Sequence, residues 1–250
     1  MDASTVVIAG MGEVGRPLFN ILRKTYVVHG VDLAPQEPPR HCSVLHVCYP
    51  FQIPDFVATT IAYVAKYQPE LVIIHSTVVP GTTQWVQQES HCPVAYSPVR
   101  GKHATMEQDM LRYRKFVAAR DGRVLTAAEG HLQNAGFMTA RFPSLEVGEL
   151  AKVLETTWLG VLVAWTQEME RLAKLHGGTF EDVRAFTREV EYIPHTILPG
   201  RIGGHCVMPN IALLKSVYES PFFDAIEWAN AAKTQSLTAE EREAPKVVEV

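Results

Sequence analysis

The sequence predicts an α/β protein, in which a doubly wound parallel sheet of the Rossmann type is followed by a smaller all-helical domain with one long central helix. From residue 4 to about residue 143, short apolar runs alternate with stretches of helical periodicity, as in a parallel sheet covered by helices on both faces. From residue 144 the pattern changes to one long run with apolar residues at spacings of three and four. We therefore expect a cofactor-binding domain over residues 1–143, a helical domain over 144–235 and a mobile tail over 236–250.

The first βαβ unit is the most informative stretch. Residues 6–9 form an apolar run typical of a buried parallel strand, and Gly10-x-Gly12-x-x-Gly15 follows at once. A helix is predicted over residues 17–24, and a second apolar strand over 26–31 ends at Asp32, 22 residues after Gly10. Strand, glycine-rich turn, helix, strand and acid in this order are the context that a dinucleotide-binding turn requires.

Each small residue of this turn has a physical reason. Gly10 allows the tight turn, Gly12 lets backbone approach a pyrophosphate, and Gly15 lets the helix pack closely on the strand. The carboxylate of Asp32 would accept hydrogen bonds from a ribose diol and repel a 2′-phosphate, which favours NAD over NADP. A glycine-rich turn that binds nothing is the alternative. The predicted cofactor-binding residues are Gly10, Met11, Gly12, Glu13, Val14, Gly15, Asp32, Ser76 and Thr77.

The other elements follow from the same patterns. Further strands are predicted over residues 44–48, 71–74, 94–96 and 115–119. Further helices are predicted over residues 51–67, 124–135, 180–189 and 211–219, and one more ends at about residue 90. The long helix over 144–176 would measure about 45 Å. This length suits the spine of a helical domain or a dimer interface, and its apolar stripe includes Trp158 and Trp165.

Composition excludes several classes of protein. The chain has 250 residues, 47% of them hydrophobic and 20% charged, with a net charge of −4 and no basic block, which argues against a nucleic-acid surface. It has no apolar run long enough for a membrane span and no secretory leader pattern. Cys42, Cys48, Cys92 and Cys206 form no CxxC pair. They indicate reduced thiols in the cytoplasm rather than a disulfide framework or a metal site.

Five stretches, in order, carry a family resemblance: residues 10–15, 76–82, 97–98, 148–152 and 199–206. With them the chain resembles the UDP-glucose/GDP-mannose dehydrogenases, the NAD-dependent nucleotide-sugar 6-dehydrogenases, from residue 5 to about residue 220. The glycine-rich turn is shared with many folds. The run Pro-Gly-Arg-Ile-Gly-Gly-His-Cys downstream of Glu-Leu-Ala-Lys is far more specific.

The resemblance implies three catalytic residues. Cys206 matches the nucleophile that traps an aldehyde as a thiohemiacetal, which is oxidised to a thioester and hydrolysed. Lys152 matches a lysine that stabilises an alkoxide and favours the thiolate, and Thr77 would help to hold a water or the substrate hydroxyl. Outside this context, Cys206 would be a packed thiol, Lys152 a solvated residue and Thr77 the cap of the next helix.

Three departures from the family pattern affect the chemistry. Val99 stands where the family has a glutamate, Thr156 where it has an asparagine, and Asn210 where it has an aspartate. The resemblance further implies a shortened member without the C-terminal domain that closes over the nucleotide of the substrate. By analogy with the family, whose long central helix builds the dimer, we expect a homodimer through the helix over 144–176. We therefore expect a shortened, NAD-dependent dehydrogenase that oxidises a sugar-like primary alcohol, with a two-electron step easier to defend than the double oxidation. The alternatives are a non-catalytic NAD-binding protein and a Rossmann enzyme with diverged chemistry.

Overall fold

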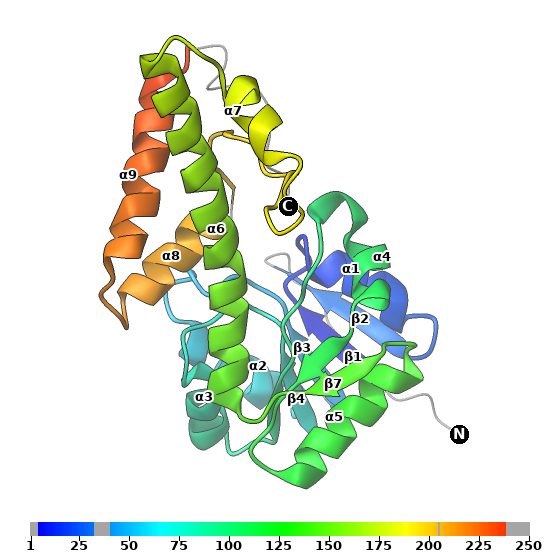
Figure 1. Cartoon of the computed structure of the whole chain (residues 1–250). Coiled ribbons are helices and arrows are strands. Elements are labelled where there is room, and N and C mark those ends of the chain that lie inside the picture. The colour runs from blue at the N-terminus through cyan, green and yellow to red at the C-terminus, as the bar shows by residue number, and fades with distance from the viewer. Residues whose placement is uncertain (1–4, 33–40, 205, 239–250) are drawn as a thin grey trace. The chain divides into compact units, whose positions relative to one another are not determined.

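A computed structural model of the chain describes residues 5–32, 41–204 and 206–238. The chain divides into two compact units, residues 1–152 and residues 153–249, drawn from blue to green and from green to red (Figure 1). The division falls inside a helix, and the predicted domain limits at residues 143 and 235 remain predictions. Residues 239–250 of the predicted tail lie outside the described residues.

The first unit is built on a five-stranded parallel sheet with the strand order β2-β1-β3-β4-β5. Val6 of β1 pairs with Val28 of β2 on one side and with Val44 of β3 on the other. The direction of the strand order reverses beside β1, so the carboxyl ends of β1 and β3 form the switch point where α/β proteins bind ligands. The strands are β1 (Thr5–Ala9), β2 (Val27–Val31), β3 (Val44–Val47), β4 (Leu71–Ile74) and β5 (Val94–Tyr96).

Helices cover both faces of this sheet, which confirms the predicted doubly wound fold. Alternate residues of β1 point to opposite faces: Val6 and Ile8 join one apolar core, Val7 and Ala9 the other. The first core is closed by α1 (Gly15–Leu22), α4 (Met106–Arg112) and α5 (Gly122–Asn134), and the second by α2 (Phe56–Tyr67) and α3 (Thr82–Ser90).

Some elements differ from the sequence-based prediction. The helix predicted over residues 51–67 begins only at Phe56, because the Asp55 side chain caps it by accepting a hydrogen bond from the Ala58 N–H at 2.9 Å. The strand predicted over 115–119 is β6 (Lys115–Val117), which pairs in parallel with the unpredicted β7 (Thr139–Arg141) in a separate two-stranded sheet. A short 3-10 turn, His103–Thr105, precedes α4, which was also not predicted.

The second unit is helical. It contains most of α6 (Leu145–Leu175), together with α7 (Phe180–Thr187), α8 (Val207–Lys215) and the unpredicted α9 (Pro221–Ser236). The predicted long central helix is therefore confirmed, whereas α8 begins four residues before the predicted position 211. Helices α8 and α9 approach α6 at Gly160, where a Cβ would lie 2.8 Å from Val207 and 3.5 Å from Ile226. Among the described helices, none combines the length and hydropathy that a membrane span requires.

Candidate cofactor and active site

The turn between β1 and α1 is tightly constrained. Gly10 adopts φ +91°, and its N–H donates to the Val31 carbonyl at 2.8 Å. A Cβ at Gly10 would lie 2.6 Å from the Tyr49 nitrogen, and a Cβ at Gly15 only 1.8 Å from the Gly10 carbonyl oxygen. Gly12 is exposed, and a Cβ there would meet nothing within 4 Å. Gly10 and Gly15 are thus required by the protein's own backbone, whereas at Gly12 only a ligand could make a side chain costly.

Asp32 follows β2 and faces this turn. Its Oδ2 accepts a hydrogen bond from the Met11 N–H at 3.1 Å, so the predicted carboxylate and the predicted turn do lie together. Arg16 holds the turn from the helix side, because its Nε donates to the Met11 carbonyl at 2.7 Å. These residues form part of an open hollow lined by Met11, Arg16, Phe19, Val28, His29, Gly30 and Asp32.

The other two residues of the turn lie at the start of α1. Val14 occupies the N-cap position, and its side chain makes no capping hydrogen bond. The first N–H groups of α1 therefore receive no side-chain cap from this position. Glu13 is exposed, and its Oε2 lies 3.2 Å from Nε2 of His103. A helix terminus of this kind fits a pyrophosphate group, which would take the uncapped N–H groups as donors.

Ser76 and Thr77 follow β4. The Ser76 hydroxyl is buried and donates to the Tyr49 carbonyl at 2.6 Å, which ties the end of β4 to the segment after β3. Thr77 is half-buried, and it does not cap the next helix, since the N-cap of α3 is Gly81 with φ +98°. The interpretation of Thr77 as a helix cap is therefore wrong.

The cap of α3 comes from Glu149 of α6. Its carboxylate accepts from the Gly81 N–H at 2.6 Å, the Thr83 N–H at 2.8 Å and the Thr83 hydroxyl at 2.6 Å. Burial raises the pKa of Glu149, while the hydrogen bonds from Thr83 and Gly81 lower it. Three bonds to a helix N-terminus account for this buried acid as a structural group.

The two predicted reactive side chains lie in different units. Lys152 is half-buried on α6, at the end of the first unit. Cys206 is exposed and occupies the N-cap position of α8, in the second unit. An exposed thiol at a helix N-terminus is not a packed core cysteine.

The three residues that we expect to depart from the family pattern, Val99, Thr156 and Asn210, are all buried. Val99 is buried in the same apolar core as Met106 and Met110, where a carboxylate would be desolvated. Asn210 is also buried, and its Nδ2 donates to the Thr156 hydroxyl at 2.9 Å, which in turn donates to the Val153 carbonyl at 2.9 Å. Thr156 and Asn210 thus satisfy each other without a charge.

Sequence reasoning missed a chain of three buried histidines in the first unit. Nδ1 of His75 lies 2.6 Å from the Ser97 carbonyl oxygen, His75 Nε2 lies 2.8 Å from His46 Nδ1, and His46 Nε2 lies 3.0 Å from His131 Nε2. A carbonyl can only accept, so His75 carries its proton on Nδ1 and accepts at Nε2. With neutral rings, His46 must then be protonated on Nδ1 and His131 on Nε2.

The protonation behaviour agrees with this neutral chain. Burial, followed by the neighbouring histidines and Lys115, lowers the pKa of His46, and burial also lowers the pKa of His75. Burial lowers the pKa of His131 to about 4. The sequence offered one signal: His46 interrupts an apolar strand and His75 directly follows another, but only the fold brings His131 to them. The described residues hold no cluster of three side chains arranged for a metal ion.

Comparison with known proteins finds one matching family model and several solved structures with a similar fold. Residues 146–234 match the model of the UDP-glucose/GDP-mannose dehydrogenase family, central domain. A UDP-D-ManNAc dehydrogenase from Pyrococcus horikoshii shares 17% identity at a TM-score of 0.79, over 92% of this chain and 69% of that one. A UDP-glucose dehydrogenase from Pyrobaculum islandicum shares 18% identity at a TM-score of 0.77, over 92% and 68%.

A shorter protein has the same fold. The 3-hydroxyisobutyrate dehydrogenase from Mycobacterium tuberculosis shares 16% identity at a TM-score of 0.71, and the match covers 94% of each chain. A sequence search of curated proteins finds no match. The predicted resemblance to nucleotide-sugar dehydrogenases is confirmed, and the solved structures show that the fold extends over nearly the whole chain.

Proposed function

Because residues 146–234 carry the central domain of the UDP-glucose/GDP-mannose dehydrogenase family, we propose that the protein is an NAD-dependent oxidoreductase. Its substrate class is a sugar-like primary alcohol, and the reaction is a two-electron oxidation. The observation that carries the proposal is the turn over residues 10–15, where Gly10 and Gly15 close the backbone and Gly12 stays open beside an uncapped helix N-terminus.

The residues present fit NAD. Gly12 and the first N–H groups of α1 would receive the pyrophosphate, and Asp32 would receive a ribose diol. Ser76 and Thr77 would line the same edge of the sheet, at the end of β4. When bound, NAD supplies the hydride acceptor for the oxidation of the alcohol.

The chemical roles fall to Lys152, Thr77 and Cys206. Lys152 would stabilise the alkoxide that forms as the substrate hydroxyl loses its proton, and Thr77 would orient that hydroxyl. Cys206 is the proposed nucleophile for the resulting aldehyde. With Asn210 in place of an acid, a thioester at Cys206 would hydrolyse slowly, because an amide cannot act as a base.

Cofactor choice gives the first test. We expect NAD to bind more tightly than NADP, and Asp32→Ala to reduce this preference roughly tenfold, which corresponds to about 1.4 kcal/mol. Calorimetric titration of both cofactors into both proteins measures the preference. Equal or tighter binding of NADP by the unaltered protein would refute the assignment.

Activity gives the second test. NADH formation is followed by its absorbance, with a panel of nucleotide sugars and simple sugars as candidate substrates. Lys152→Met should abolish turnover while leaving NAD affinity unchanged. Cys206→Ser should leave a two-electron oxidation intact, and intact-mass spectrometry of the unaltered protein should detect any acylated Cys206. Turnover that survives Lys152→Met would remove the lysine from the site.

A second candidate function is a non-catalytic NAD-binding protein. Two observations favour this candidate. Val99 is buried, and Asn210 forms an uncharged pair with Thr156, so positions 99 and 210 both lack the acid of the family pattern. Cofactor binding without NADH formation from any sugar in the panel would select this candidate.

Assembly is the last part of the proposal. Leu154, Trp158, Trp165 and Leu172 of α6 share one helical face and are 43–68% exposed in the chain. We infer that this stripe forms a homodimer interface, because a single chain leaves it open to water. Light scattering at micromolar concentration should give twice the monomer mass, and Trp158→Glu should give the monomer. None of the four cysteines is in a disulfide bond, which suits a reducing, cytoplasmic setting.

A further inference from the structure

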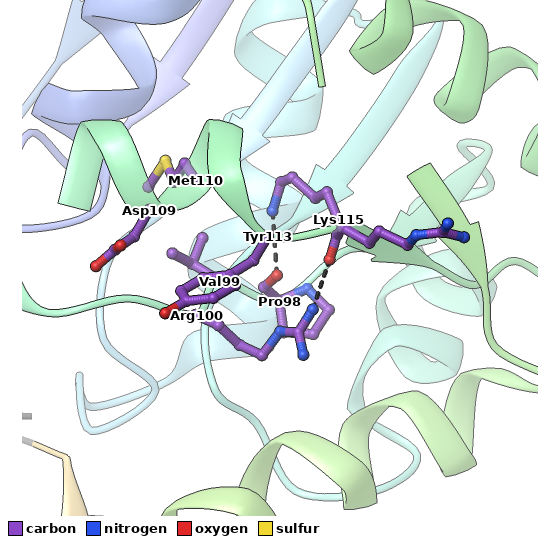
Figure 2. Close-up of a pocket in the computed structure, with 8 residues that line it drawn as sticks. Pro98, Val99, Arg100, Asp109, Met110, Tyr113 and Lys115 are labelled. Atoms are coloured by element: carbon purple, nitrogen blue, oxygen red, sulfur yellow. Dashed lines mark hydrogen bonds between the residues drawn. The ribbon is translucent and has the colours of Figure 1, made fainter. Parts of the chain in front are cut away.

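Two of the stretches that carry the family resemblance are held by buried side chains that hydrogen-bond to their backbone. In the first, Nζ of the buried Lys115 donates to the Ser97 carbonyl at 2.9 Å and to the Pro98 carbonyl at 3.1 Å. Figure 2 shows this amine directed at the Pro98 carbonyl. The second stretch, residues 199–206, ends at Cys206, the proposed nucleophile, and it is held by side chains from α6 and α9 of the second unit.

Asn230 of α9 binds both polar atoms of the Ile202 backbone. Its Oδ1 accepts a hydrogen bond from the Ile202 N–H at 2.7 Å, and its Nδ2 donates to the Ile202 carbonyl at 3.0 Å. Gln167 of α6 adds a third contact, because its Nε2 donates to the Gly200 carbonyl at 2.7 Å. Gln167 is 3% exposed and Ile202 is 5% exposed, so little water competes for these hydrogen bonds.

These contacts hold a segment whose own backbone has unusual freedom. Gly200, Gly203 and Gly204 are three of the five residues from 200 to 204, and glycine loses more conformational freedom on folding than any other residue. Gly204 adopts φ +81°, and a Cβ there would meet nothing within 4 Å. The path of this segment therefore depends on the hydrogen bonds that it receives from the two amide side chains.

The chain is fixed again directly after Cys206. Val207, the first residue of α8, is 6% exposed and packs on α6 at Gly160, where a Cβ would lie 2.8 Å from the Val207 side chain. Cys206 itself is exposed and is the N-cap of α8. Its thiol thus lies between two fixed points, Ile202 four residues before it and Val207 directly after it.

We propose that Asn230 is a positioning residue for the Cys206 thiol and that Gln167 supports it. The two amides hold the backbone at residues 200–202, and this backbone maintains the conformation that leaves the thiol exposed at the N-terminus of α8. The N–H groups at a helix N-terminus favour a thiolate, which is the form that attacks an aldehyde carbon. The proposal rests on the proposed function of Cys206 as the nucleophile.

Alkylation by iodoacetamide tests the position of the thiol without NAD or a substrate. The full chain is treated across a pH series, and the rate at Cys206 is followed by peptide mass mapping. The pH at which the rate is half its maximum reports the pKa of the thiol. The other three thiols react slowly, because Cys42 and Cys92 are buried and burial raises the pKa of Cys48 to about 12.

Asn230→Ala removes both hydrogen bonds to the Ile202 backbone. We expect the half-maximal pH to rise toward about 8.5, the pKa of an unperturbed cysteine, and the rate at neutral pH to fall roughly fivefold. A change in stability alone would not move this pH profile. An unchanged profile in the folded Asn230→Ala protein would overturn the proposal.

Lys233→Met is the matched control. It removes the ion pair between Lys233 of α9 and Glu170 of α6, which joins the same two helices and makes no contact with the Ile202 backbone. Glu170 keeps Lys174 as a partner at 3.2 Å. We expect the alkylation profile of the unaltered protein in this variant. The same shift in Lys233→Met and Asn230→Ala would overturn the positioning role.

Gln167→Met keeps the test decisive if Asn230→Ala fails to fold. Gln167 Oε1 is buried and has no hydrogen-bond partner among the described residues, so methionine removes an unsatisfied acceptor together with the donor to Gly200. The half-maximal pH should rise by a smaller amount than in Asn230→Ala, because one hydrogen bond is lost instead of two. If Asn230→Ala does not fold, an unchanged profile in Gln167→Met overturns the proposal.

This result is separable from the test of the proposed function. Alkylation requires neither cofactor nor substrate, so it reports on Asn230 even if no sugar in the panel yields NADH. NADH formation together with an unchanged alkylation profile in Asn230→Ala would refute the positioning role and leave the proposed oxidation standing.

Discussion

The glycine turn of the first unit and the Thr156–Asn210 pair of the second unit contrast in how their residues are constrained. In the turn, backbone atoms lie so close to Gly10 and Gly15 that no residue with a Cβ fits at either position. In the pair, a hydroxyl and an amide satisfy each other at 2.9 Å in a buried setting. Many combinations of polar side chains could do the same.

This difference explains why the turn keeps the glycines that a dinucleotide-binding pattern requires, whereas the Thr156–Asn210 pair can differ from the residues that the family pattern leads us to expect there. Where backbone atoms leave no room for a Cβ, only glycine fits, so the turn can be recognised in the sequence from its glycines. A side-chain pair needs only complementary donors and acceptors, so its members can change together while the helices stay packed. Under the proposed function, the departures at Thr156 and Asn210 would therefore alter the chemistry without disturbing the fold around them.

The largest expected effect is at Gly15. Alanine normally stabilises a helix relative to glycine, but a Cβ here would lie 1.8 Å from the Gly10 carbonyl oxygen. Gly15→Ala should therefore lower the free energy of unfolding by about 4 kcal/mol, as measured by urea denaturation.

Gly12→Ala is the matched control for Gly15→Ala. Its Cβ would meet nothing within 4 Å, so stability should change by less than about 0.5 kcal/mol. NAD affinity should nevertheless fall, because the methyl group would occupy the approach of the pyrophosphate. A stable Gly15→Ala protein would show that the turn adapts and is no more constrained than the Thr156–Asn210 pair.

The next effect is at Glu149, which ties α6 to the start of α3. Glu149→Ala would leave the Gly81 and Thr83 N–H groups without their acceptor, so we expect a loss of about 3 kcal/mol in the free energy of unfolding. Glu89→Ala, at an exposed position of α3, should change stability by less than about 0.5 kcal/mol. Equal effects of the two substitutions would refute the capping role.

The same contrast describes what could be predicted from the sequence. The β1–α1–β2 unit was predictable because its glycines, apolar strands and Asp32 follow one another along the chain. The segments α4 and β7 are only 7 and 3 residues long, too short for a periodic pattern. The capping role of Glu149 and the contact of His46 with His131 were not predictable, because they join residues 66 and 85 positions apart through the fold.

A third prediction concerns the histidine chain and pH. The pKa of His131 is lowered from 6.5 to about 4, so between these values the unfolded chain binds a proton that the folded chain does not. Stability therefore falls as the pH decreases through this window, by about 2 kcal/mol between pH 7 and pH 5 from His131 alone. Urea denaturation at both pH values measures the loss.

His131→Gln should reduce this pH dependence, because a glutamine amide donates to His46 without titrating. His176→Gln, at an exposed position of the second unit, should leave it unchanged. A pH dependence that is the same in all three proteins would place the protonation elsewhere.

The smallest expected effect is at Asn210, where an acid can be restored. In Asn210→Asp the new carboxyl would replace an amide donor beside the Thr156 hydroxyl in a buried position, so burial should raise its pKa above that in the unfolded chain. A raised pKa contributes stability at low pH that is lost as the pH rises, so we expect a loss of about 1 kcal/mol at pH 7 and a smaller loss at pH 4. Adding Thr156→Asn supplies an amide donor to the carboxylate and should recover part of the loss at pH 7. Recovery in the double variant would show that the two positions change as a pair, whereas additive losses would show that the second region is as rigidly constrained as the glycine turn.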